Sequence, residues 1–352
     1  MTRTFFFLCF TLLATFSAIG QDFNFTQFYA APLQLNPALT GGTEGLYRFS
    51  INYRDQWRQA LDNPHTTAAA ALDLRFPVTF STSSTKDAAG IGISFFNDRV
   101  PKIGFSTSQL AISGAFHKSL NDRNNQYLSL GLQIGLNQRN VNYQNLTFED
   151  QFDGSNGYTQ ATSENLPPNN NFPFSDMAVG ANYTYNPNKK FGLFLGGAIH
   201  HLFQPQVSFF YDRRNEDPER GDSRIYRKFT GHFSTKIPIT NKMQLLPRAM
   251  FTSQGPHTAL NVGSNIRIGL GEYAGSAIHV GGWVRPVSNE ANQYELAAAI
   301  FMIGFEANNI VFGFSYDAGL SNIQSPFNQG AFELSVSYLG DYDNETILCP
   351  KF

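Results

Sequence analysis

The residues from Tyr47 to Arg58, YRFSINYRDQWR, alternate between two kinds of side chain. The odd positions are aromatic or aliphatic, apart from Asp55, whereas the even positions carry three arginines and the polar residues serine, asparagine and glutamine. Because successive residues of a β-strand point to opposite faces, a strand here has one apolar face and one strongly polar face. Such a strand suits a wall with lipid on one side and water on the other, and it fits badly in the core of a soluble sandwich.

The same alternation recurs along most of the remaining chain. We predict about 14 strands, at residues 46–57, 66–76, 88–97, 107–118, 126–138, 176–186, 190–202, 224–236, 242–252, 257–270, 275–285, 293–305, 309–318 and 330–339. The pattern is clearest in 126–138, where leucine and isoleucine share one face and serine, glycine, glutamine and asparagine share the other. We therefore predict an all-β fold, a transmembrane antiparallel β-barrel over residues 46–340 with a periplasmic amino terminus.

The lengths of the links between strands support this topology. Links after even-numbered strands are mostly short, such as 186–189 and 239–242, whereas both very long links, 139–175 and 203–223, follow odd-numbered strands. Outer-membrane barrels have short periplasmic turns and long external loops, and the predicted barrel reproduces that arrangement. Two links are exceptions: 77–87 is long for a turn, and 253–256 is tight for an external loop. A soluble β-propeller, the alternative fold, gives no reason for short links to follow even-numbered strands and long links to follow odd-numbered ones.

The composition agrees with a membrane barrel. Charged residues make up 15% of the chain, below the roughly 25% of ordinary soluble domains. Aromatic residues reach 14%, yet the mean hydropathy is -0.25, as expected when only alternate residues face lipid. The net charge of -2 gives no indication of a nucleic-acid partner.

Residues 1–20 are predicted to be a signal peptide. Arg3 precedes an apolar run from Phe5 to Phe16, and the residues Ala-Ile-Gly before Gln21 form a small-x-small cleavage site. The apolar run is shorter than the roughly 20 residues that a membrane-spanning helix needs. Removal of the signal peptide leaves Cys349 as the only cysteine, so the mature chain can form no internal disulfide. Cys349 lies in a carboxy-terminal tail predicted at 341–352.

Residues 21–45 show no strand alternation and are punctuated by Pro32, Pro37 and the pair Gly41-Gly42. This irregular segment either leads through the periplasm to the first strand or folds back onto or into the barrel as a plug. A lumen of about 14 strands is wider than side chains alone can fill. Water, long loops, this segment or a second protein must therefore occupy it.

Motifs for catalysis or metal binding are missing from the sequence. The seven histidines are scattered, and HExxH, GxSxG, P-loop and cysteine–histidine patterns do not occur. We therefore predict neither a metal site nor a cofactor, and no enzyme activity. A triad built around Ser113 and His117 stays open as a remote alternative. The mixed-charge run 212–220 is expected to be a solvated loop, and 152–173 a lid, plug or contact surface.

Several short motifs occur in order along nearly the whole chain. They are Gln27-Phe28-Tyr29, Pro32-Leu33, Asn36-Pro37-Ala38 with Gly41, Tyr53-Arg54-Asp55-Gln56-Trp57, Ser315-Tyr316-Asp317 with Ser321-Asn322, Ala331-Phe332-Glu333 and Cys349-Pro350. Together they resemble the PorP/SprF family of outer-membrane proteins of type IX secretion and gliding motility in Bacteroidota. The position that is usually tyrosine after the Asn-Pro-Ala motif is Leu39 here.

The resemblance implies localisation in the cell outer membrane, contact with its lipid, and a binding role. The expected partner is a cell-surface adhesin or other cargo with a carboxy-terminal sorting domain, or a component of the periplasmic ring. A passive porin or small-molecule uptake channel is the alternative function, and a barrel enzyme is the third. Candidate partner-binding residues are Gln27, Tyr29, Asn36, Pro37, Arg54 and Trp57.

Two expectations about side chains follow. Arg54 lies on the polar face of its strand, so it should point into the lumen and be paired, because an ionisable group at membrane depth must pair or face water. The apolar residues of the irregular segment, Phe25, Phe28, Tyr29, Leu33 and Leu35, are exposed to the periplasm unless something covers them. Exposed, they would form a contact surface for a partner, and packing of the segment inside the barrel is the alternative.

Overall fold

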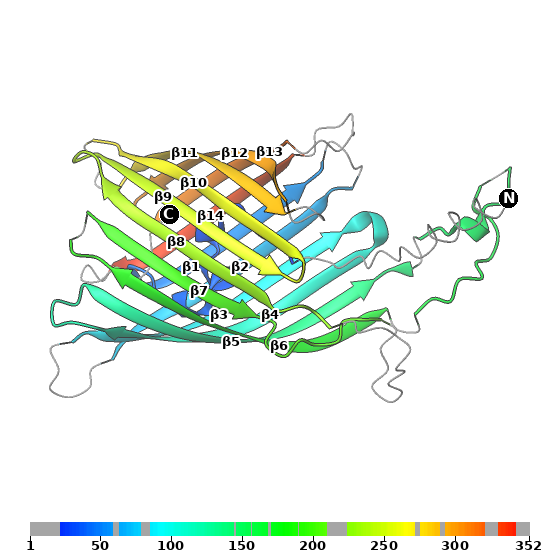
Figure 1. Ribbon diagram of the computed structural model, residues 1–352, viewed down its shortest axis with the longest axis horizontal. Coiled ribbons are helices and arrows are strands. Elements are labelled where there is room, and N and C mark those ends of the chain that lie inside the picture. The colour runs from blue at the N-terminus through cyan, green and yellow to red at the C-terminus, as the bar shows by residue number, and fades with distance from the viewer. Residues whose placement is uncertain are drawn as a thin grey trace, which may run out of the picture.

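The predicted strands pair in sequence order and close on themselves. In the computed structural model, each strand is antiparallel to the next, and β1 completes the ring by pairing with β14 (Figure 1). The structure describes residues 22–58, 63–78, 85–143, 146–155, 157–167, 170–188, 190–209, 224–271, 275–288, 293–320 and 330–342. Closure leaves no sheet edge, which is the condition for a β-structure to stand in hydrocarbon.

The fourteen strands have the following bounds. They are β1 (Gly45–Gln56), β2 (His65–Val78), β3 (Asp87–Val100), β4 (Phe105–Ser119), β5 (Gln126–Val141), β6 (Asn171–Tyr185), β7 (Gly192–His200), β8 (Lys228–Pro238), β9 (Met243–Gln254), β10 (His257–Gly269), β11 (Ala277–Ser288), β12 (Tyr294–Ala307), β13 (Ile310–Gly319) and β14 (Ala331–Tyr342). The prediction of an all-β antiparallel barrel of about 14 strands is therefore confirmed.

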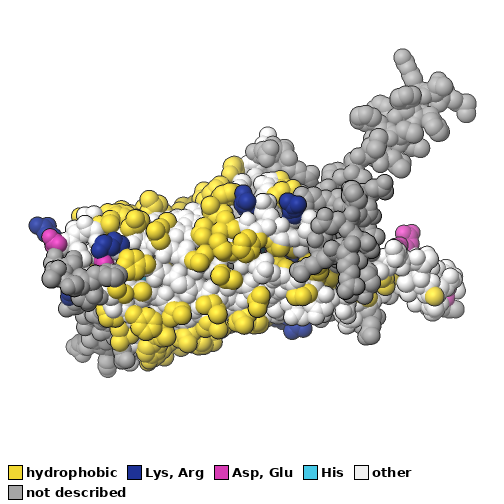
Figure 2. Space-filling view, turned by 90° about the horizontal axis from the view of Figure 1, so that it is seen from below, with side chains coloured by type: hydrophobic (Ala, Val, Ile, Leu, Met, Phe, Trp, Pro, Cys, Tyr) yellow, Lys and Arg dark blue, Asp and Glu magenta, His cyan; other side chains and the backbone are white. Residues whose placement is uncertain are grey.

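The two faces of the wall follow the alternation in the sequence. On β1, Phe49 and Ile51 are 41% and 43% exposed, whereas Arg48 and Arg54 are buried. On β5, the leucines and isoleucines of the predicted apolar face all point outward. Figure 2 shows hydrophobic side chains spread over the outside of the barrel. The exposed apolar band is the surface that lipid covers in an outer-membrane barrel.

The barrel has two different ends. All odd-numbered strands end, and all even-numbered strands begin, at one end of the barrel, which we call the long-link end because the sequences between β5 and β6 and between β7 and β8 are the longest. Even-numbered strands end at the opposite, short-link end, where β1 begins. In outer-membrane barrels these ends face the outside and the periplasm, respectively.

Some boundaries differ from the prediction. Strand β6 begins at Asn171 instead of 176 and includes Pro173. Strand β7 is shorter and pairs with β6 only from Val179 onward, so the first part of β6 extends beyond β7 and is unpaired on that side, where a proline is tolerated. Strand β8 begins at Lys228 instead of 224.

Residues 22–44 lie inside the barrel, along its length. They contain three single-turn helices, η1 (Phe28–Ala30), α2 (Pro32–Leu35) and η2 (Pro37–Leu39). Asp22 contacts residues at the long-link ends of β7, β8 and β9, and the chain then descends to the start of β1 at the short-link end. We call residues 22–44 the interior segment.

Several predicted features lie outside the described residues. They are the signal peptide at 1–20, the mixed-charge run 212–220, Ser321-Asn322, and the end of the tail with Cys349. Two further single-turn helices, η3 (Pro101–Ile103) and η5 (Glu149–Gln151), occur in links. Among the described helices, none is long and apolar enough to cross a membrane, a finding that does not bear on β-barrels.

The topology can be tested with single cysteines in a Cys349→Ser background. Ser155→Cys, in the 142–170 link, should react with a membrane-impermeant maleimide on intact cells, because that link belongs to the long-link end. Asn188→Cys, in the short link between β6 and β7, should react only after the outer membrane is permeabilised. The reverse result would invert the barrel.

Candidate functional site

The interior segment is attached to the barrel by four charged side chains near the long-link end. Arg54 and Glu333 are direct partners across β1 and β14, and their side chains form an ion pair. Arg54 also pairs with Asp317 of β13 at 3.0 Å, and Arg285 of β11 pairs with the same carboxylate at 2.9 Å. We call these four residues the wall ion cluster. The prediction that Arg54 points inward and is paired is confirmed.

The interior segment supplies hydrogen bonds that the wall ion cluster needs. The backbone N–H groups of Thr26 and Gln27 donate to the two oxygens of Glu333 at 2.6 and 2.9 Å. The Thr26 hydroxyl donates to Asp317 at 2.8 Å and accepts from Arg54 at 2.7 Å. Because buried charges are tolerated only when they are paired and hydrogen-bonded, the segment and the cluster stabilise each other.

Tyr29 lies beyond this cluster on the β9–β12 side. Its ring stacks on Trp283 of β11 with centroids 5.8 Å apart, and the Arg248 guanidinium lies 4.0 Å from its centroid. The Tyr29 hydroxyl accepts a hydrogen bond from Asn265 at 3.4 Å. Burial raises the pKa of Tyr29 to about 12. The tyrosine is therefore an uncharged anchor of the interior segment.

The Asn-Pro-Ala motif lies against the opposite wall, halfway down the barrel. The Asn36 amide donates to the carbonyl groups of Ala181 and Gly197 at 3.0 and 3.2 Å, and its oxygen accepts from the N–H of Ala38. Glycines of the wall make this approach possible. A Cβ at Gly131 would lie 2.3 Å from the backbone of the motif, and one at Gly180 would lie 1.9 Å from the Asn36 oxygen.

Ion pairs and hydrogen bonds also hold the last part of the interior segment, towards the short-link end of the barrel. Asp73 of β2 pairs with Arg48 at 2.8 Å and accepts a 2.7 Å hydrogen bond from the N–H of Gly41. His117 donates from Nε2 to the Thr40 carbonyl at 2.9 Å, and Ser113 contacts the Thr40 hydroxyl at 2.8 Å. Ser113 and His117, considered above for a triad, thus both bind the interior segment.

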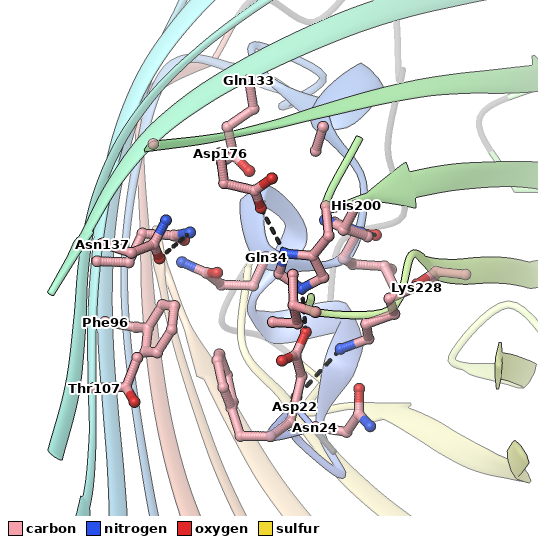
Figure 3. A pocket seen from close by; sticks show the side chains of 18 of the residues that line it. Asp22, Asn24, Gln34, Phe96, Thr107, Gln133, Asn137, Asp176, His200 and Lys228 are labelled. Carbon is pink, nitrogen blue, oxygen red and sulfur yellow. Dashed lines mark hydrogen bonds and ion pairs between the residues drawn. The ribbon is translucent and has the colours of Figure 1, made fainter. Parts of the chain in front are cut away.

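The beginning of the interior segment, at the long-link end of the barrel, is held by a histidine between two carboxylates. His201, the first residue after β7, contacts Asp22 through Nε2 at 2.5 Å and Asp176 of β6 through Nδ1 at 2.6 Å (Figure 3). Burial alone would lower the pKa of His201, but the carboxylates raise it to about 10. Burial likewise opposes ionisation of Asp22, yet His201 holds the pKa of that carboxyl well below its usual range. We call Asp22, His201 and Asp176 the N-terminal latch.

The interior segment does not fill the whole lumen. A cavity remains between the segment and strands β3 to β9 in the long-link half, with an empty volume of about 880 Å³ that includes space open to solvent. Its walls include phenylalanines, amide side chains and the N-terminal latch (Figure 3). The described residues contain no cluster of three or more side chains suited to hold a metal ion.

The six candidate partner-binding residues lie in different places. Gln27 and Arg54 meet at the wall ion cluster, whereas Tyr29, Asn36 and Pro37 contact other strands, and all five are buried. Trp57 is 40% exposed at the long-link end, where it directly follows β1. Of the two alternatives for the irregular segment, the structure shows packing inside the barrel and not exposure to the periplasm: Phe25, Phe28, Tyr29, Leu33 and Leu35 are all buried in the lumen.

Sequence reasoning did not single out Glu333, Asp317 and Arg285 as site residues. Glu333 and Asp317 stood in the motifs used for the family resemblance, and each is a carboxylate on the polar face of its strand. That position is the signal that could have identified them. Asp22 gave no such signal, because it lies in the irregular segment, and His201 was predicted to end the strand 190–202, whereas β7 ends at His200.

Replacing Arg54 with leucine should destabilise the barrel. The change leaves Glu333 and Asp317 with less positive charge in a dry part of the lumen, at a cost on the order of 3–5 kcal/mol. The measurement is the temperature at which the purified barrel loses its heat-modifiable mobility on a gel. Arg123→Leu is the control, because that residue is exposed at the short-link end and its replacement should behave like the wild type. Equal stability of both variants would contradict the role given to Arg54.

The N-terminal latch predicts a pH dependence. A free histidine titrates near 6.5, but latched His201 holds its proton to about 10. Its contribution to stability is therefore complete below pH 6.5 and is lost as the pH rises towards 10. The Asp22 contribution has the opposite sign, being present above the ordinary value of 3.8 and lost on acidification.

The melting temperature of the purified barrel should accordingly fall between pH 6.5 and 9.5. His201→Asn should be less stable at pH 6.5 and should show a flatter profile over that range. His257→Asn, outside the latch, is the control and should retain the wild-type slope. A slope that is the same in all three proteins would rule out the latch as its origin.

No curated protein resembles the chain closely enough to count as a match. Among solved structures, BamA from Haemophilus ducreyi lacking POTRA domains 1–3 is similar over 84% of this chain and 70% of its own, with 10% identity and a TM-score of 0.43. A FadL homologue from Pseudomonas aeruginosa is similar over 86% and 92%, with 11% identity and a TM-score of 0.46.

The CymD monoaromatic hydrocarbon channel is similar over 91% of this chain and 94% of its own, with 10% identity and a TM-score of 0.46. At such identities these structures resemble the chain in fold alone. The sequence profile of the type IX secretion system membrane protein PorP/SprF family matches residues 17–338. Because that match covers most of the chain, the protein belongs to the PorP/SprF family and is an outer-membrane β-barrel of the type IX secretion system.

Proposed function

We propose that the barrel binds a protein partner of the type IX secretion system at the cell surface and anchors it or helps to export it. The partner is an exported surface protein with a carboxy-terminal sorting domain. The observation that carries this proposal is the occupied lumen: the barrel's own interior segment lies in the channel, and its contacts extend from the long-link end to the short-link end. A barrel occupied in this way is better suited to hold a protein at its rim than to pass solutes.

The link between β5 and β6 offers a surface for such a partner. It projects beyond the rim of the barrel (Figure 1). It carries Phe152 and Tyr158, which are 51% and 56% exposed and whose ring centroids lie 5.5 Å apart. Asp153 folds the turn between them by accepting hydrogen bonds from the N–H groups of Ser155 and Gly157. An exposed aromatic pair on a folded projection, away from the lipid-facing wall, favours a protein contact.

The buried candidate residues have an indirect role in this proposal. Gln27 and Arg54 hold the part of the interior segment near the long-link end, and Asn36 holds its middle. Trp57 lies at the rim and is available for direct contact. The buried residues then determine the shape of the long-link end without touching the partner.

A periplasmic ring component is the second partner class, and it would bind the short-link end. Ile239, in the short link after β8, is 53% exposed and represents that surface. A passive porin is the alternative function, for which the remaining cavity is the only support within the described residues.

The proposal predicts which surface change releases the partner. Barrels carrying Phe152→Ser with Tyr158→Ser, or Ile239→Ser, would be purified in mild detergent from their native cells, and co-purifying proteins identified by mass spectrometry. The loop variant should lose at least about 90% of a co-purified protein with a sorting domain, since exposed aromatic anchors often dominate binding. The Ile239 variant should retain it.

The opposite pattern, with a ring component lost from the Ile239 variant, would favour the periplasmic role. Conductance in planar bilayers separates both from the porin. The purified barrel alone should give no stable open channel, and a steady conductance in the wild type would favour uptake of small molecules. Heat-modifiability confirms that each variant is folded.

A further inference from the structure

The cavity beside the interior segment has the features of a ligand site. Its empty volume of about 880 Å³ includes space open to solvent, and its walls combine apolar side chains with a few polar ones, as in small-molecule sites. One wall is the interior segment, which contributes Gln34, and the other includes a row of β5 residues, Gln133, Gly135, Asn137 and Arg139. Alternate residues of one strand share a face, so this row points into the lumen together.

Three hydrogen-bond donors on these walls lack an acceptor. They are Gln34 Nε2, Asn137 Nδ2 and Arg139 Nε. Asn137 is only 5% exposed, and its oxygen already accepts a 2.9 Å hydrogen bond from Gln109, which fixes the amide with its NH₂ group unused. Buried donors without partners are costly in a native protein and call for an explanation. Figure 3 shows the Gln34 side chain extending towards Asn137 from the opposite wall.

The charges around the cavity favour an anion. Its two carboxylates, Asp22 and Asp176, both bind His201. Arg139 has no carboxylate within ion-pair distance among the described residues, although the more distant Asp22 attracts its charge, and Lys228 donates to the Phe23 carbonyl at 3.3 Å. With His201 protonated, three basic groups face two carboxylates around the cavity, and the amide donors of Gln34 and Asn137 have no acceptor.

Aromatic side chains form the apolar part of the same cavity. The rings of Phe23 and Phe96 lie 4.4 Å apart, and the Arg139 guanidinium carbon lies 5.8 Å from the ring centroid of Phe174. Such surfaces accept a flat apolar group by stacking, next to the guanidinium that binds a carboxylate in a forked geometry.

We propose that this cavity binds a carboxylate joined to a flat apolar group. Arg139 and Asn137 bind the carboxylate, Gln34 adds a donor from the interior segment, and the phenylalanines receive the apolar group. Either a small aromatic acid or the free carboxy terminus of a peptide with an aromatic last residue carries this chemistry. The inference goes beyond the proposed partner binding and does not depend on it, because the cavity is inside the barrel and the loop surface is outside.

Isothermal titration of the purified full-length barrel in detergent tests the proposal. The probes are 3-phenylpropanoate and its uncharged amide, which differ only in the carboxylate. The wild type should bind the acid at least about tenfold more tightly than the amide, the value of one charge-assisted hydrogen bond. Arg139→Gln should remove that preference, whereas Arg123→Gln, at an exposed position of the short-link end, should retain it.

Gln34→Ala gives a second variant that leaves the barrel wall unchanged, and it should weaken binding of the acid if Arg139→Gln does not fold. A peptide ending in phenylalanine, with a free or an amidated terminus, identifies the source of the carboxylate. Preferential binding of the free peptide, the small acid or both supports the site. Equal binding of acid and amide, no binding of any probe, or an undiminished preference in both Arg139→Gln and Gln34→Ala would overturn it.

Discussion

The closed sheet is the constraint on which the rest of this structure depends. Hydrocarbon offers no partner for backbone N–H and C=O groups, so a chain that crosses it with strands must pair every strand on both sides. Fourteen strands satisfy this requirement because β1 pairs with β14. The resulting lumen is too wide to be filled by its own wall. Its polar inner face therefore needs another occupant, which here comes from residues 22–44 of the same chain.

The interior segment suits this lumen because it brings backbone groups as well as side chains. Short helices and irregular backbone leave N–H groups unused, and those of Thr26, Gln27 and Gly41 are donated to carboxylates of the wall. Carboxylates and arginines that would otherwise need water thus become part of a dry, paired interior. Each partner compensates a desolvation cost of the other, which explains why the segment is held by charges rather than by apolar packing alone.

The interior segment fills one side of the lumen more completely than the other. Phe28, Tyr29, Leu35 and Leu39 form one apolar cluster with residues of β9, β11, β12 and β13, while space remains beside β3 to β9 in the long-link half. Further down, the Asn-Pro-Ala motif crosses to β5 and β6, where glycines leave room for its backbone. In the two proposals made above, the filled side supports the rim that binds a protein partner, and the open side leaves the donor-lined cavity that binds a carboxylate.

The sequence by itself determined the wall and its orientation. A period of two places Arg54 inward and Phe49 outward whatever the neighbouring strands are, and link lengths distinguish the two ends of the barrel. It could not determine the path of residues 22–44, because a segment without a period has no preferred face and its place depends on contacts made in space. The Asp22–His201 contact joins residues 179 positions apart. Only the closed barrel brings them together, and only the occupied lumen shows which donors remain unused.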